Sequence, residues 1–235
     1  MESVKLQRTY LDLTTPHVAD ACMRLGIPVR CAPVGMHPLW EGVHVVGRVR
    51  PARHYGSVDV FLEAISQAAP GDVLVVDNEG REDEACVGDL ITLEASRAGL
   101  SGIVIWGLHR DTTELRTIRL PVFSMGALPV GPQRLDGQQP NALQSAVCGR
   151  HVVGDDDFVL GDGDGVIFIP IKRAAEVAEV ATIIRDTERR QAAHMRLGTT
   201  LREQAQFERF IAARANDMAL TFRQHLRAIG GEIEE

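Results

Sequence analysis

The sequence predicts an α/β fold, because short apolar runs alternate with segments of helical spacing. The runs at 73–77 (VLVVD) and 102–106 (GIVIW) are rich in β-branched residues and lie beside glycine, as is typical of buried strands. A helical pattern at 58–69 (VDVFLEAISQAA) precedes the first run, and another at 89–98 separates the two runs. The three features together indicate alternating strands and helices within one domain.

The other elements follow in chain order. Thr15 and Pro16 predict the start of a short opening helix, with an N-cap followed by a proline at the first helical position, and Gly26 predicts its end. Residues 43–49 (VHVVGRV) form the first β-branched run. Further short buried strands are expected at 121–125 and at 166–169.

The chain changes character at Arg173. Two helical stretches rich in Ala, Arg and Glu follow, separated by Gly198. We therefore expect an α/β domain at 1–172 and a C-terminal helical extension of the same domain at 173–235. Apolar side chains of the extension need a surface to pack against, and a neighbouring subunit is the natural candidate, although the helices could also fold back on their own sheet.

Composition narrows the function classes. Of 235 residues, 45% are hydrophobic and 24% charged, as in soluble globular proteins, and no stretch approaches the roughly 20 apolar residues of a membrane span. The amino terminus has no apolar core of a secretory signal, which favours the cytoplasm. A net charge of -7 argues against a nucleic-acid partner, because such surfaces cluster Lys and Arg. The four cysteines form no C-x-x-C pair and are expected to be reduced and mostly buried.

Two short motifs in the middle third contain residues that could bind a ligand. Gly88 to Ile91 opens a predicted helix, whose unpaired N–H groups could bind a small carboxylate, or Gly88 and Asp89 could simply cap it. The segment from Gly107 to Asp111 follows a predicted buried strand, where ligands often bind in open α/β sheets. His109, within it, is the only histidine near this chemistry.

Other polar clusters have structural explanations. The acidic residues at 155–157 and 162–164 lack the length and terminal Glu of a calcium loop, so we expect turns between strands. The acidic run from Glu79 to Glu84 is expected to be a solvated loop, although its position before Gly88 could also place it at the rim of a pocket.

Taken together, the two motifs form a D-x20-R-D pattern, in which twenty residues separate Asp89 from Arg110 and Asp111 directly follows Arg110. This pattern resembles that of the 4-hydroxy-4-methyl-2-oxoglutarate/4-carboxy-4-hydroxy-2-oxoadipate aldolases of the family named for the regulator of ribonuclease E activity A. Similar stretches lie at 19–26 (ADACMRLG), 70–77 (PGDVLVVD), 107–129 and 161–170 (GDGDGVIFIP). The resemblance implies a swivelling β/β/α domain, here with a C-terminal helical extension.

The resemblance also implies roles for particular residues. The substrate carboxylate would be held by the turn of Gly88, Asp89, Leu90 and Ile91. Arg110 would contact the 2-oxo acid, and Asp111 would anchor a divalent cation, Mg2+ or Mn2+. Hard cations of this kind prefer oxygen ligands and keep waters when few protein ligands are offered.

Two further roles involve catalysis and assembly. Asp89 would orient a water that acts as base. Glu188 would be a catalytic residue lent by a neighbouring subunit, although a Glu on an Arg-rich helix also fits a solvated i,i+4 partner. The resemblance implies a homotrimer, or a hexamer of two trimers.

The predicted function is a metal-dependent lyase that cleaves a 4-hydroxy-2-oxo acid to pyruvate, with oxaloacetate decarboxylation as a related activity. Cleavage leaves carbanion character beside the carbonyl, so the reaction needs a cation at the enolate oxygen and a base for the hydroxyl proton. The 71–111 segment contains no lysine, which argues against a Schiff-base aldolase there. The alternative is a non-catalytic, protein-binding regulator of a ribonuclease, and the presence of Asp111 favours the enzyme.

Overall fold

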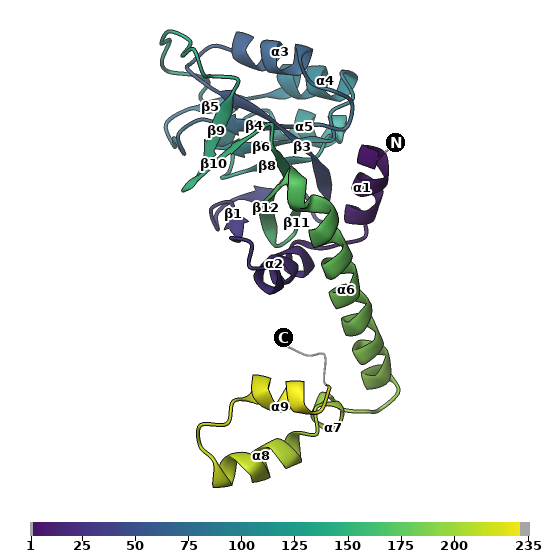
Figure 1. Cartoon of the computed structure of the whole chain (residues 1–235). Helices are drawn as coiled ribbons and strands as arrows, with labels where there is room; N and C mark the ends of the chain where they lie inside the picture. The colour runs from purple at the N-terminus through teal and green to yellow at the C-terminus, as the bar shows by residue number, and fades with distance from the viewer. Residues whose placement is uncertain (1, 231–235) are drawn as a thin grey trace.

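A computed structural model of the chain describes residues 2–230, and its centre is an eight-stranded mixed sheet (Figure 1). The four middle strands are parallel, in the order β3-β4-β6-β8, and each outer strand pairs antiparallel with its neighbour in the sheet. Along the sheet the strands are β1 (Arg30–Cys31), β12 (Gly165–Pro170), β11 (Asp157–Asp162), β3 (Val45–Arg53), β4 (Val73–Asp77), β6 (Gly102–Trp106), β8 (Val122–Ser124) and β2 (His37–Pro38).

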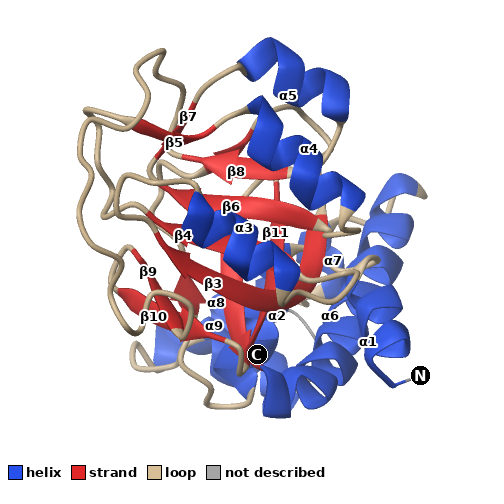
Figure 2. Ribbon diagram, turned by 90° about the horizontal axis from the view of Figure 1, so that it is seen from above, coloured by secondary structure: helices blue, strands red, loops and turns tan. Residues whose placement is uncertain are grey.

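Three helices cover one face of the parallel strands (Figure 2). They are α3 (Asp59–Ser66), α4 (Asp89–Arg97) and α5 (Thr112–Ile118), each lying between two parallel strands in the chain. Alternate strand residues such as Leu74 and Ile103 pack against Phe61 of α3 and Leu115 of α5. This α/β arrangement confirms the predicted fold class.

The opposite face is covered by strands. The hairpin of β9 (Ser145–Cys148) and β10 (His151–Gly154) packs with β11 and β12 over Val75, Val104 and Phe123. Because the middle strands are apolar on both faces, every residue of β4 is buried. The strand β11 and this hairpin had not been identified from the sequence.

A second helical group packs on β11 and β12. It consists of α1 (Glu2–Tyr10), α2 (Thr15–Arg24) and the first half of α6 (Ala174–Arg196). The N-cap of α2 is Thr14, one residue earlier than predicted, and it forms a capping box with His17. The carboxylate of Asp162 accepts hydrogen bonds from the backbone N and the hydroxyl of Thr15, both at 2.7 Å. Asp162 and Asp157, which pairs with Arg30, therefore have structural roles, and the acidic clusters flank turns as expected.

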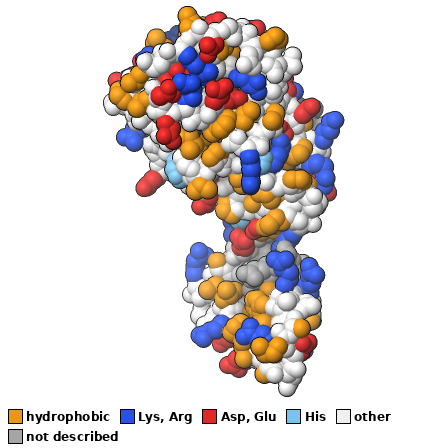
Figure 3. Space-filling view, turned by 90° about the vertical axis from the view of Figure 1, so that its left-hand side faces the viewer, with side chains coloured by type: hydrophobic (Ala, Val, Ile, Leu, Met, Phe, Trp, Pro, Cys, Tyr) orange, Lys and Arg blue, Asp and Glu red, His pale blue; other side chains and the backbone are white. Residues whose placement is uncertain are grey.

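The C-terminal helices leave the sheet (Figure 1). In α6, Val177, Ala181 and Ile184 are buried against the second helical group, whereas the residues after Thr187 are half-buried or exposed. Three short helices follow instead of one long stretch: α7 (Leu201–Gln204), α8 (Phe207–Asn216) and α9 (Phe222–Ala228). Their rings form a small core of their own, and Figure 3 shows them as a separate lobe below a narrow waist.

Two other expectations can be compared with the structure. None of the helices in residues 2–230 is long and apolar enough to cross a membrane. All four cysteines are free, and Cys22, Cys86 and Cys148 are buried while Cys31 is exposed. Burial raises the pKa of Cys22 to about 11 and that of Cys148 to about 12, so these thiols remain protonated at neutral pH.

Candidate active site

A small parallel pair of strands brings the two sequence motifs together. Gly88 directly follows β5 (Ala85–Val87), and Arg110 directly follows β7 (Leu108–His109), which pairs with β5. The backbone N of Arg110 donates to the carbonyl of Val87 at 3.0 Å. Residues 22 positions apart thus meet at the start of α4.

Gly88 leaves the space in which the side chains of Arg110 and Asp111 lie. A Cβ at Gly88 would be 2.4 Å from Asp111 Oδ2 and 3.2 Å from Arg110 Nε. The two charged groups lie side by side, with Arg110 Nε 3.4 Å from Asp111 Oδ2. Their side chains are 47% and 35% exposed, so both can be reached by a small solute.

The first turn of α4 attracts carboxylate oxygens. Asp89 Oδ1 accepts from the backbone N of Leu90 at 2.7 Å, and the backbone N of Asp89 lies 3.4 Å from Asp111 Oδ2. Leu90 itself is largely exposed, which keeps this helix end open to solvent. Free N–H groups at a helix N-terminus favour anions, and here two side-chain carboxylates contact them.

Asp111 adopts an uncommon backbone conformation. It is the N-cap of α5 and has φ 59° and ψ 41°, in the left-handed region that disfavours most residues with a side chain. Asp tolerates this region better than bulkier residues, and such conformations concentrate at functional sites. The conformation supports a functional role for this position.

His109 faces away from solvent. It is buried, with Nδ1 2.7 Å from Ser124 Oγ and Nε2 3.0 Å from Thr112 Oγ1. Burial lowers the pKa of His109, which favours its neutral form. The ring therefore connects β7 to β8 and to the first residue of α5, and its position beside Arg110 in sequence does not give it access to a substrate in this chain.

Glu188 lies on α6, on the side of the molecule formed by α2. Its Oε2 is 3.2 Å from Nε2 of His17, and its side chain is 54% exposed. Within one chain it therefore belongs to the α2–α6 surface and not to the Gly88 turn. Its predicted role in the site of a neighbouring subunit stays a prediction.

The donor set at Asp111 suits a hydrated hard cation. Residues 2–230 contain no group of three His, Cys, Asp or Glu side chains that could hold a metal ion. Mg2+ does not need such a cage, because it retains several waters and binds through one or two carboxylates together with substrate oxygens. The accessible carboxylate of Asp111, beside the space left by Gly88, meets that requirement.

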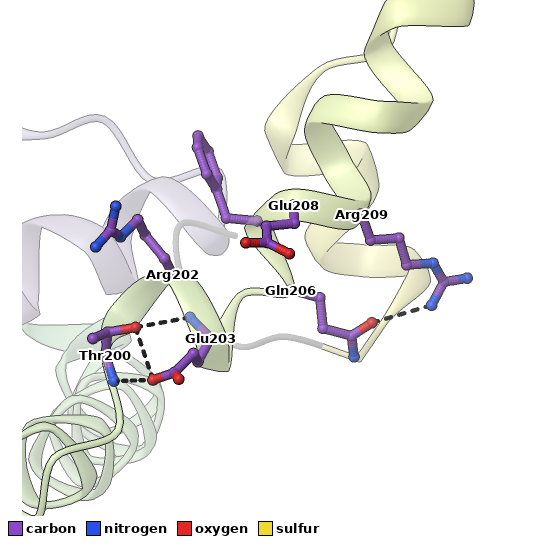
Figure 4. Close-up of a pocket in the computed structure, with 7 residues that line it drawn as sticks. Thr200, Arg202, Glu203, Gln206, Glu208 and Arg209 are labelled. Carbon is purple, nitrogen blue, oxygen red and sulfur yellow. Dashed lines mark hydrogen bonds between the residues drawn. The ribbon is translucent and has the colours of Figure 1, made fainter.

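Two surface hollows lie away from this turn. One is lined by Thr200, Arg202 and Glu203 of the α7 region and by Gln206 to Arg209 at the start of α8 (Figure 4). Two of its polar residues, Thr200 and Glu203, form the capping box at the N-terminus of α7. Another is lined by Met23, Arg24, Arg223 and Arg227. Neither contains a predicted site residue.

The structure corrects one expectation beside the site. Glu84, assigned from sequence to a solvated loop, is fully buried between His54, Arg81 and Arg134. Burial raises the pKa of the Glu84 carboxyl, but the hydrogen bond from the Gln133 backbone and the two guanidinium groups outweigh burial and lower it overall. The only sequence signal was the apolar run that begins at the next residue, Ala85.

Comparison with known proteins shows which family the chain belongs to. The sequence model of the RraA-like family, described as Aldolase/RraA, matches residues 15–168, which span the sheet, the Gly88 turn and Asp111. The chain belongs to the RraA-like family. A Halalkalibacterium halodurans protein provisionally named 4-hydroxy-4-methyl-2-oxoglutarate aldolase is 31% identical over 145 residues, which cover 61% of this chain and 68% of that protein.

Solved structures of the RraA-like family share the fold. An uncharacterized protein from Pseudomonas syringae aligns with a TM-score of 0.74 and 27% identity, over 85% of this chain and 96% of its own. RraAS2 of Streptomyces coelicolor, described as an unusual member of the RNase ES inhibitor RraA protein family, aligns with a TM-score of 0.69 and 25% identity, over 79% and 94%. The family thus includes proteins named for an aldolase and a protein named for ribonuclease inhibition.

Proposed function

We propose that this protein is a divalent-metal-dependent lyase that cleaves 4-hydroxy-2-oxo acids to pyruvate. The substrate class is 4-hydroxy-4-methyl-2-oxoglutarate or 4-carboxy-4-hydroxy-2-oxoadipate, and oxaloacetate decarboxylation is a related activity. The observation that carries the proposal is the contact of Gly88, Arg110 and Asp111 at an exposed helix N-terminus. The aldolase name of the Halalkalibacterium relative supports it.

Substrate binding would use the start of α4. The carboxylate of the 2-oxo acid would replace Asp89 Oδ1 at the Leu90 N–H, where the helix dipole favours negative charge. Released from that hydrogen bond, the Asp89 carboxylate would orient a water that takes the proton of the 4-hydroxyl group. The turn from Gly88 to Ile91 would therefore hold the substrate and help to place the base.

Bond cleavage moves negative charge toward the 2-oxo group. As the proton leaves the 4-hydroxyl, the C3–C4 bond breaks, its electron pair forms the enolate of pyruvate, and C3 is then protonated. Arg110 would stabilise the enolate oxygen through its fixed charge and planar fork. Asp111 would hold Mg2+ or Mn2+, which when bound supplies further positive charge at the oxygens of the substrate.

Assembly belongs to the same proposal. The Arg110 and Asp111 side chains are partly exposed in one chain, and a trimer, or a hexamer of two trimers, would cover them with a neighbouring subunit. Glu188 would then act in the neighbouring site, away from the His17 contact of its own chain. A cleft that excludes water strengthens the electrostatic contribution of Arg110.

The decisive experiment measures pyruvate release from the three substrates with and without Mg2+. Excess EDTA should abolish activity, and Mg2+ or Mn2+ should restore it, because the enolate charge would otherwise have only Arg110 to stabilise it. The Asp111→Asn variant should show no restoration. Full activity in chelator would overturn the proposed mechanism.

The likeness to RraAS2 favours a second candidate, a protein-binding regulator of a ribonuclease. Inhibition of a purified ribonuclease E-type enzyme by this protein, together with no pyruvate from any of the three substrates, would support it. Pyruvate release that depends on Asp111 would favour the lyase.

A further inference from the structure

The guanidinium group of Arg110 is confined from two sides although its side chain is 47% exposed. On one side, Nε lies 3.4 Å from Asp111 Oδ2. On the other, the backbone of Gly131 is so close that a Cβ there would be 2.7 Å from Arg110 Nη1. Gly131 therefore limits where the guanidinium can lie.

The segment 130–134, which contains Gly131, is held by hydrogen bonds to the buried carboxylate of Glu84. Glu84 Oε2 accepts from the backbone N of Gln133 at 2.7 Å, and Glu84 Oε1 accepts from Arg134 Nε at 3.2 Å. The next residue, Ala85, donates its backbone N to the carbonyl of Val130 at 2.8 Å. The segment 130–134 is thus tied to the chain just before β5 by three hydrogen bonds.

Glu84 is itself held firmly. It is fully buried, and Arg81 Nε lies 3.5 Å from its Oε1. Arg134 is also anchored, since Nη2 donates to the His54 carbonyl and to Asn78 Oδ1, both at 3.1 Å. A buried carboxylate that loses its partners is strongly destabilised, so this cluster has little freedom to rearrange.

We infer that Glu84 is a positioning residue, which holds the segment 130–134 so that Gly131 directs the Arg110 guanidinium toward the 2-oxo acid. The inference rests on the proposed function, because it concerns the same arginine. It adds a residue that does not touch substrate, lies directly before β5 and acts through the segment 130–134. It also predicts that a side chain at position 131 displaces the guanidinium from its contact with Asp111.

Gly131→Ala tests the contact directly, since no positive φ strains an alanine at this position and only the added methyl group matters. Its kcat/KM for pyruvate release should fall at least about tenfold, because misplacing a catalytic group by about 1 Å can cost on the order of 100-fold. Gly137→Ala, in the same loop, is the matched control, since its Cβ meets nothing within 4 Å. It should leave kcat/KM unchanged.

A double variant separates positioning from general damage. Lysine has no Nη1, so in an Arg110→Lys background the Gly131→Ala change should lower kcat/KM by less than about twofold. Equal losses in both backgrounds would overturn the inference. A crystal structure of Gly131→Ala should show the guanidinium displaced from Asp111 Oδ2, and an undisplaced guanidinium would also overturn it.

Glu84→Gln tests the other end of the contact. It keeps an acceptor for the Gln133 N–H but loses the charge that pairs with Arg134, and it should reproduce both the lowered kcat/KM and the weaker loss in the Arg110→Lys background. If it does not fold, the Gly131→Ala results still decide the contact with Arg110. A folded Glu84→Gln variant with wild-type kinetics would remove Glu84 from the inference.

The two proposals can fail separately. If the wild-type chain releases no pyruvate, the proposed function fails, while the crystal structure of Gly131→Ala still tests the contact. If the wild-type chain is active and Gly131→Ala is equally active, the function stands and the inference fails.

Discussion

At Arg110 the proposed chemistry depends on shape as well as charge. Arg110→Lys keeps the positive charge but loses the planar fork, and it should lower the turnover of pyruvate release by a factor on the order of 100. Steady-state kinetics with Mg2+ measure this effect. Arg97→Lys, at an exposed position on α4, is the control and should behave as wild type. Wild-type kinetics in the Arg110→Lys variant would remove Arg110 from the site.

Gly88 tests the space beside Asp111. Its φ of −130° is accessible to alanine, so the Gly88→Ala variant should fold, with a loss in the free energy of unfolding of about 1 kcal/mol for the poorer N-cap. The added Cβ would lie 2.4 Å from Asp111 Oδ2, so Mg2+-dependent pyruvate release should fall at least about tenfold.

Calorimetric Mg2+ titration should show weaker binding to the Gly88→Ala variant. Gly163→Ala, whose Cβ meets nothing within 4 Å, provides the comparison for both measurements. Unchanged Mg2+ binding and activity in Gly88→Ala would separate Asp111 from the proposed metal role.

At the scale of elements, the ends of β3 and β4 are joined by a buried polar cluster. His54 lies just after β3, stacks on Phe61 of α3, and has Nδ1 2.8 Å from Asn78 Oδ1. Burial lowers the pKa of His54, while the nearby Glu84 raises it and Arg134 and Arg81 lower it, with a net decrease. The folded state therefore favours neutral His54.

This decrease predicts how stability depends on pH. The pKa of histidine in an unfolded chain is about 6.5. At pH values between this pKa and the lower pKa of folded His54, the unfolded chain binds more protons than the folded chain. The free energy of unfolding should then fall as pH decreases from 6.5 to 5.5, by at most about 1.4 kcal/mol per pH unit from His54. Glu84, whose pKa is lowered, contributes only at more acidic pH.

Urea unfolding at pH 7.5, 6.5 and 5.5 measures this slope. His54→Gln should be less stable at every pH but should show a shallower slope between 6.5 and 5.5. Some slope should remain, because burial also lowers the pKa of His109. Identical slopes in the variant and the wild type would show that His54 does not carry the effect.

At the scale of the whole molecule, the helices after Gly198 stand apart from the sheet (Figure 3). Leu197 and Met218 are 85% and 82% exposed. Residues 199–230 contain five arginines against three acidic residues, in a chain of net charge -7. An apolar and basic lobe on an acidic protein fits a surface of a second copy of the chain. The predicted trimer or hexamer would cover it.

Truncation tests this assembly. A chain ending at Gly198 should dissociate or form a smaller oligomer in light scattering, and its pyruvate release should fall. The cut must follow Gly198, because removal from Arg173 onward would also take away Val177, Ala181 and Ile184 and expose the apolar cluster that they cover. Its urea unfolding should show that the sheet domain still folds. A full-length chain that is an active monomer would contradict the shared site.

Local patterns were sufficient for the core elements. The strands at Val73–Asp77 and Gly102–Trp106 and the helix from Asp89 have the predicted starts, because β-branched runs and a helix opening after glycine are properties of neighbouring residues. The D-x20-R-D pattern indicated the family and selected Asp89, Arg110 and Asp111. It also indicated the chemistry that an accessible Arg-Asp pair could support.

Only the tertiary structure decided the surroundings of those residues. The β5–β7 pair is too short to be read from sequence, yet it brings Gly88 to Asp111. Glu84 can be buried because it pairs with Arg134 and His54, each at least thirty residues away in the sequence. No local sequence pattern predicts such contacts. The preference for strand or helix is largely local, so the sequence by itself determined the core elements. Burial of a charge depends on residues distant in the chain, so only the fold decided the surroundings of Glu84.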